Sequence, residues 1–116
     1  MAADVSSERR RFFRLPYPEG PVRPMFLTVG GGFPVTEISE KGLRFACQRF
    51  AAFKLNQPVK GIVRFQNGQT CSVEGAVLRL TSDTVVLFLS RGIPLNQIIE
   101  EQRVLINLRR SSPSLP

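Results

Sequence analysis

The first residues that could do chemistry lie near the N-terminus, where Arg9, Arg10, Arg11 and Arg14 fall within six positions. Guanidinium groups fork onto phosphate oxygens and onto the O6 and N7 atoms of guanine, and they stack on purine faces. In an extended segment the side chains of residues i and i+4 point the same way, so Arg10 and Arg14 of this RxxxR pattern can converge on one anionic ligand. Taken alone, the pattern is a weak signal, and a solvated basic tail explains it better.

A second group of polar residues lies at positions 37–42, between two predicted strands. The hydroxyl of Ser39 can donate and accept hydrogen bonds, and Gly42 permits a close backbone approach to a ligand. The carboxylate of Glu37 is an acceptor that can meet the N1 and N2 hydrogens of a guanine. Taken alone, these residues also fit an ordinary turn.

The composition restricts the function classes that are open to the chain. Its 116 residues support one small domain, and they include no histidine, which removes a Ser-His-Asp triad and any zinc site with histidine ligands. Acidic residues are sparse and scattered, so no metal cluster or pair of catalytic carboxylates is evident. We therefore predict that the protein is not an enzyme and needs no cofactor or metal.

The positive charge comes mostly from arginine. Sixteen Lys and Arg against nine Asp and Glu give a formal charge of +7, and thirteen of the sixteen are arginines. This bias favours planar recognition of phosphates and bases over bulk charge, although genomic base content explains it equally well. Arg79 and Arg91 could border a ligand site, but we assign them to the solvated surface.

Absent features point to the cytoplasm. The polar N-terminus has no apolar segment of a secretory signal, and no apolar run approaches the roughly 18 residues of a membrane helix. Cys47 and Cys71 lie far apart with no CxxC spacing, which predicts free thiols in a reducing compartment.

The elements that must position these residues are mostly strands. Prolines at 16, 18, 21 and 24 rule out regular helix there, so residues 1–24 are predicted to form a flexible Arg- and Pro-rich arm. Asn67-Gly68 predicts a hairpin and Gly75 a bulge. Short apolar runs separated by turn residues then predict six strands, at 25–29, 33–38, 42–47, 59–65, 70–80 and 84–89.

The last element has a different period. Apolar residues recur at three- and four-residue steps beyond Pro94, which predicts an amphipathic helix that ends near Leu108 and packs on the barrel or on a partner. The tail at 109–116 is predicted to fray. The fold class is thus all-β, a sheet or barrel at 25–108 that is followed by the C-terminal helix within the same domain. Phenylalanines on the strands are expected in its core, namely Phe26, Phe33, Phe45, Phe65 and Phe88.

At this point the sequence resembles the PilZ domain family, whose members bind the bacterial second messenger cyclic di-GMP. In that family an RxxxR motif on an N-terminal arm precedes a six-stranded antiparallel β-barrel with a helix after its last strand, and a (D/N)xSxxG motif lies between the second and third strands. The resemblance therefore implies this fold for residues 25–108. Arg10-x-x-x-Arg14 matches the first motif, and Ser39-x-x-Gly42 matches most of the second. Glu37 departs from the family pattern, because Asp or Asn usually stands there. Arg9 precedes RxxxR, where an arginine is associated in the family with binding a stacked pair of ligands.

The resemblance implies a bacterial, cytoplasmic cyclic di-GMP receptor without a membrane span. Arg9, Arg10 and Arg14 would clamp the ligand from the arm, while Glu37, Ser39 and Gly42 would receive a guanine edge and an effector protein would read the altered surface. One alternative is a PilZ-type adaptor that binds no nucleotide and acts by protein contacts. Another is a small basic barrel that binds RNA or DNA, but the concentration of arginines in one arm counts against nucleic acid as a partner.

Overall fold

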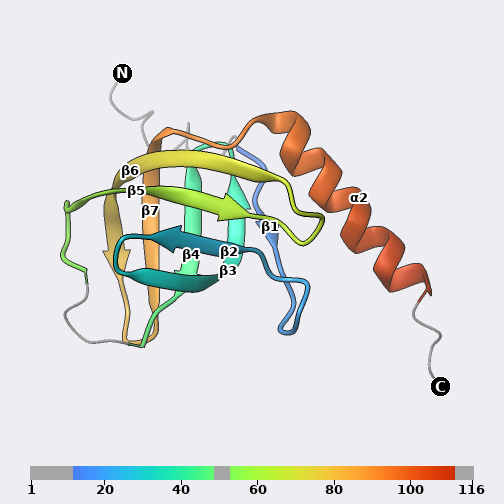
Figure 1. The fold of residues 1–116 in the computed structure, drawn as a ribbon, viewed down its shortest axis with the longest axis horizontal. Helices are drawn as coiled ribbons and strands as arrows, with labels where there is room; N and C mark the ends of the chain where they lie inside the picture. The colour runs from blue at the N-terminus through green and yellow to red at the C-terminus, as the bar shows by residue number, and fades with distance from the viewer. Residues whose placement is uncertain (1–11, 49–52, 112–116) are drawn as a thin grey trace.

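The computed structural model describes residues 12–48 and 53–111, which form one β-barrel with a C-terminal helix (Figure 1). The first half of the chain contributes four strands, β1 (Leu15–Pro16), β2 (Met25–Thr28), β3 (Gly31–Ser39) and β4 (Gly42–Ala46). The second half of the chain contributes β5 (Pro58–Arg64), β6 (Thr70–Leu80), β7 (Thr84–Arg91) and the helix α2 (Leu95–Ser111).

The barrel closes through the long strand β3. The first half of β3 pairs with β2, and its second half pairs with β4. From β4 the hydrogen-bonded order continues through β7, β6 and β5, and β5 pairs with β2 to complete the barrel. Every neighbouring pair is antiparallel. The closed six-stranded antiparallel barrel and the C-terminal helix are the architecture that the sequence predicted.

One strand was not predicted. β1 adds a two-residue ladder to β3, with Leu15 opposite Ile38 and Pro16 opposite Glu37. Tyr17 continues the attachment by donating its backbone N–H to the carbonyl of Thr36 at 2.9 Å. The final part of the 1–24 segment therefore contributes to the barrel, and Leu15 and Tyr17 are both buried.

The predicted hairpin turn and the predicted β-bulge are both present. The turn at Asn67-Gly68 joins β5 to β6, and the pairing of β6 with β7 shifts register between Glu74 and Gly75. The hairpin and the bulge are thereby confirmed.

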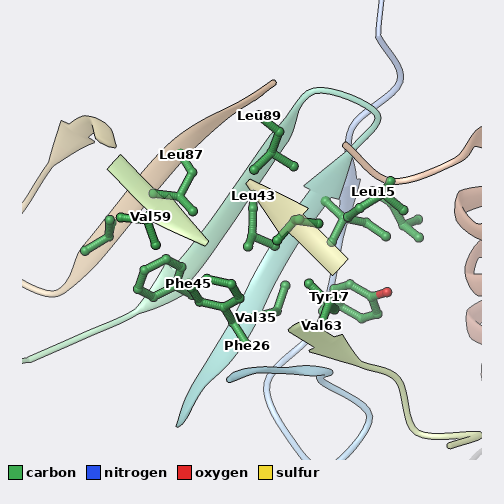
Figure 2. Packing of buried hydrophobic residues seen from close by; sticks show 14 of the residues in the cluster. Leu15, Tyr17, Phe26, Val35, Leu43, Phe45, Val59, Val63, Leu87 and Leu89 are labelled. Carbon is green, nitrogen blue, oxygen red and sulfur yellow. The ribbon is translucent and has the colours of Figure 1, made fainter. Parts of the chain in front are cut away.

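The core fills the barrel interior with aromatic and aliphatic side chains (Figure 2). Phe26 and Phe45 are fully buried with ring centroids 5.1 Å apart, and Phe33 packs against Phe45 from a partly buried position. Phe65 is buried as expected. The expectation for Phe88 is wrong, because this side chain is 43% exposed on the outer face of β7.

Helix α2 begins at Leu95, directly after Pro94, and ends at Ser111, three residues beyond its predicted end. Its inner face buries Ile98 and Glu101, whereas Leu95, Ile99 and Ile106 stay about half exposed. Figure 1 shows the helix running along the outside of the barrel and extending beyond it. Within the described part of the chain, no helix is long and apolar enough to cross a membrane.

The two cysteines are free thiols, as predicted, and Cys47 is buried whereas Cys71 is half-buried.

Candidate functional site

The β3–β4 connection is a two-residue turn, Glu40-Lys41, that places Ser39 and Gly42 directly opposite each other. Both turn carbonyls accept backbone hydrogen bonds from the end of β7 and the segment after it. Leu89 donates its N–H to the Lys41 carbonyl at 2.8 Å, and Ile93 donates to the Glu40 carbonyl at 3.2 Å. These bonds anchor the turn to the barrel, so the polar residues beside it have fixed positions.

Ser39 and Gly42 are matched in size. A Cβ atom at Gly42 would lie 3.0 Å from the Ser39 Oγ, tighter than ordinary van der Waals contact. Ser39 is buried, and the glycine opposite leaves room for its hydroxyl. A larger residue at position 42 would push against this hydroxyl.

The register of the strands creates a charged row across the outer face of the barrel. Glu37 on β3 lies opposite Arg44 on β4, Arg44 lies opposite Val86 on β7, and Val86 lies opposite Arg79 on β6. The Arg44 Nη1 lies 3.9 Å from the Glu37 Oε1, at the outer limit for an ion pair. The two side chains are 41% and 23% exposed, so water screens their attraction.

A shallow pocket of about 80 Å³ lies on this face, beside the turn. It brings together four of the six residues predicted from the sequence, namely Arg14, Glu37, Ser39 and Gly42. The remaining two, Arg9 and Arg10, lie outside the described residues. Among the charged residues that line the pocket, four are basic and one is acidic: Arg14, Lys41, Arg44 and Arg79 against Glu37.

Several residues of this pocket were not predicted as site residues. Lys41 and Arg44 lie on the turn and on β4, and Arg79, which was assigned to the solvated surface, lines the pocket. Arg44 follows Gly42 by two positions, and side chains two apart on a strand share a face. That alternation could have identified Arg44, whereas placing Arg79 on the same face requires the β6–β7 pairing and its register shift between Val77 and Arg79. Arg91 is not among the lining residues.

A separate polar contact connects the first segment to the helix. The Tyr17 hydroxyl donates to the Glu101 Oε1 at 2.6 Å, and both residues are only 5% exposed. Burial raises the pKa of the Glu101 carboxyl, and the hydrogen bond from Tyr17 opposes this shift. Burial, with the neighbouring Glu101, raises the pKa of Tyr17 as well. In Figure 2 the Tyr17 hydroxyl points out of the apolar cluster.

The described residues contain no group of three or more His, Cys, Asp or Glu placed to hold a metal ion.

No protein-family model matches the sequence, and no curated protein matches it. A solved structure with the same fold is that of the Bacillus subtilis inhibitor of motility (MotI/DgrA), with a TM-score of 0.60 and 14% sequence identity. The similarity covers 90% of this chain and 53% of that chain, so the present chain spans about half the length of its structural neighbour. The likeness shows a shared fold.

Proposed function

We propose that this protein is a non-enzymatic receptor for cyclic di-GMP in the bacterial cytoplasm and passes the signal to an effector protein. The observation that carries the proposal is the pocket beside the β3–β4 turn. Arg14 from the first motif and Glu37, Ser39 and Gly42 from the second are far apart in sequence, yet they line one pocket with an excess of basic side chains. The PilZ resemblance predicts this combination, and the six-stranded barrel agrees with it.

In this proposal the arm and the residues around the β3–β4 turn have separate roles. Arg10 and Arg14 bind phosphates and guanine faces from the arm, and Ser39 and the backbone at Gly42 receive a guanine edge. Glu37 accepts hydrogen bonds from the guanine N1 and N2 hydrogens. Its ion pair with Arg44 does not prevent this, because a partly exposed pair at 3.9 Å is worth about 1 kcal/mol at most.

The size of the pocket determines how much of the ligand it can hold. Pockets that bury a whole small molecule usually measure about 300–1,000 Å³, whereas this one measures about 80 Å³. Only an edge of the ligand enters it, and the remainder lies across the barrel surface beneath the arm. Ligand binding would then alter the surface that the barrel and the arm show to an effector.

Isothermal titration with cyclic di-GMP at low salt tests the proposal. We expect saturable binding to the unmodified protein and affinity weaker by about 10- to 100-fold for Arg14→Ala, because a charge-assisted hydrogen bond is lost. Arg64→Ala is the matched control, since Arg64 is exposed on β5 and outside the pocket. Absence of saturable heat with the unmodified protein would refute the receptor function, and equal losses in both variants would refute the role of Arg14.

The same titration reports stoichiometry. If Arg9 stacks on or forks to a second guanine, the protein binds two ligands per chain, and Arg9→Ala reduces this number to one.

The competing proposal is an adaptor of the same fold that binds no nucleotide. The pairing of Glu37 with Arg44 favours it, because the one carboxylate at the pocket already has a partner within the barrel. A flat titration with an intact fold would support this alternative.

A further inference from the structure

Phe88 is an aromatic residue whose side chain faces outward from a barrel strand. Its neighbours on β7, Leu87 and Leu89, are almost completely buried, so strand alternation turns Phe88 outward. The side chain is 43% exposed and lines the same pocket as Arg14 and Ser39. An exposed phenylalanine leaves a large apolar surface in water, which is unfavourable unless something covers it.

The residues across the sheet leave the Phe88 ring accessible. Gly42 on β4 and Ala76 on β6 lie directly opposite Phe88 in the two ladders. Directly opposed residues have Cβ atoms about 4.5–5.5 Å apart, so large side chains there would cover the ring. A glycine and an alanine cannot.

Arginine side chains lie on both sides of Val86, the next residue on the outer face of β7. Val86 lies two residues before Phe88, at a spacing of roughly 7 Å, and its ladder partners are Arg44 and Arg79. The outer face therefore presents a partly exposed aromatic ring near two guanidinium groups. An apolar protein segment would have to desolvate those charges, whereas a nucleotide offers a base to the ring and phosphates to the arginines.

We propose that Phe88 is a stacking platform for one purine base of the bound nucleotide, and that it determines the preference for a base-containing ligand over other phosphate anions. This inference rests on the proposed cyclic di-GMP receptor function and assigns a separate contact within it. Base–aromatic stacking requires the face of the ring, which the small residues on both sides leave free.

The first test compares affinities by titration calorimetry. Phe88→Leu keeps an apolar side chain but removes the ring face, and stacking predicts cyclic di-GMP binding weaker by about 5- to 100-fold. Ile62→Ala is the matched control, because Ile62 is 42% exposed on β5 and lies outside the pocket. Its affinity should equal that of the unmodified protein. Circular dichroism and thermal unfolding establish that both variants are folded.

The second test uses fluorescence and does not depend on affinity. The chain has no tryptophan, so Phe88→Trp introduces a single indole at the platform. Stacking predicts that saturating cyclic di-GMP quenches its emission, while Ile62→Trp stays unchanged.

The outcomes separate the two proposals. Binding to the unmodified protein, with unchanged affinity in Phe88→Leu and no quenching in Phe88→Trp, would overturn the platform and leave the receptor function standing. Absence of binding to the unmodified protein would overturn the receptor function itself, and the platform with it.

Discussion

Glu101 and Tyr17 form the buried polar pair of this fold, and the two residues come from opposite ends of the described chain. Their hydrogen bond of 2.6 Å fastens the segment after Arg14 to helix α2. Removing either partner would leave a buried polar group unsatisfied, which typically costs about 1–3 kcal/mol. The pair therefore links the part of the arm after Arg14 to the only helix among the described residues.

The raised pKa of Glu101 has a direct consequence for stability. Burial makes the folded protein hold the proton more tightly than the unfolded chain does, where the carboxyl titrates near 4.5. The stabilisation is therefore present below that pH and is lost as the pH rises through the folded-state pKa. Glu101→Gln keeps an acceptor and removes the titration. We expect the melting temperature of this variant, relative to the unmodified protein, to increase from pH 4.5 to pH 7, as measured by circular dichroism.

If the difference in melting temperature between the two proteins stayed constant from pH 4.5 to pH 7, unfolding would not change the pKa of Glu101. Glu74→Gln is the control for the general effect of removing a carboxylate, because Glu74 is exposed on β6 and is not among the groups that shift the pKa of Glu101.

Individual residues differ in how far the sequence could place them. Arg14 of the first pattern and Ser39 and Gly42 of the second line one pocket, whereas Arg9 and Arg10 lie outside the described residues. Phe88 was misplaced for a physical reason: the run from Val85 to Leu89 is apolar at every position, so no alternation shows which side chains face outward. The burial of Glu101 depends on Tyr17, 84 residues away, and leaves no local pattern.

Strands and helices could be predicted from local sequence more completely than the positions of individual side chains. All six barrel strands and the helix were predicted, since turn residues and apolar periodicity act over short distances. β1 was missed because prolines dominate its segment, and a proline cannot donate to a ladder. The structure accommodates Pro16 at the edge of the pairing with β3, where Leu15 and Tyr17 supply the buried side chains.

The element that holds the β3–β4 turn in place is the segment after β7. A Cβ atom at Gly92 would overlap the carbonyl oxygen of Glu40, so only glycine allows this close approach. Gly92→Ala should displace the turn, disturb the Ile93 to Glu40 hydrogen bond and destabilise the fold by about 1–3 kcal/mol. Chemical denaturation measures this difference. Cyclic di-GMP affinity should fall with it, because Ser39 and Gly42 flank the turn.

Gly30→Ala provides the comparison for this prediction. A Cβ atom at Gly30 meets nothing within 4 Å, so the variant should unfold at nearly the same denaturant concentration as the unmodified protein. Equal stability of Gly92→Ala and Gly30→Ala would contradict the role assigned to the close approach.

The formal charge of +7 on the whole molecule favours anionic ligands, which include both small nucleotides and nucleic acids. The described structure concentrates four basic side chains around one small pocket, with a single carboxylate among them. A compact ligand with two phosphates matches this arrangement. A nucleic acid would instead need a basic stripe long enough to follow its backbone, with aromatic rings along it. The aromatic residues at the pocket are Phe12 and Phe88, which are confined to this one place.

Salt dependence distinguishes these two kinds of ligand. A protein that contacts 6–10 phosphates of a nucleic acid loses about 10³- to 10⁵-fold in affinity between 50 and 200 mM salt, because condensed counterions return to the polymer. Cyclic di-GMP carries two phosphates, and the same relation limits its loss to about tenfold. We expect titrations at the two salt concentrations to differ by no more than this, and a single-stranded RNA of twenty nucleotides to bind more weakly than cyclic di-GMP at 200 mM. Tighter binding of the RNA at 200 mM, with a loss of a thousandfold from 50 mM, would make the barrel a nucleic-acid binder, since the excess charge would then act through many phosphates rather than at one pocket.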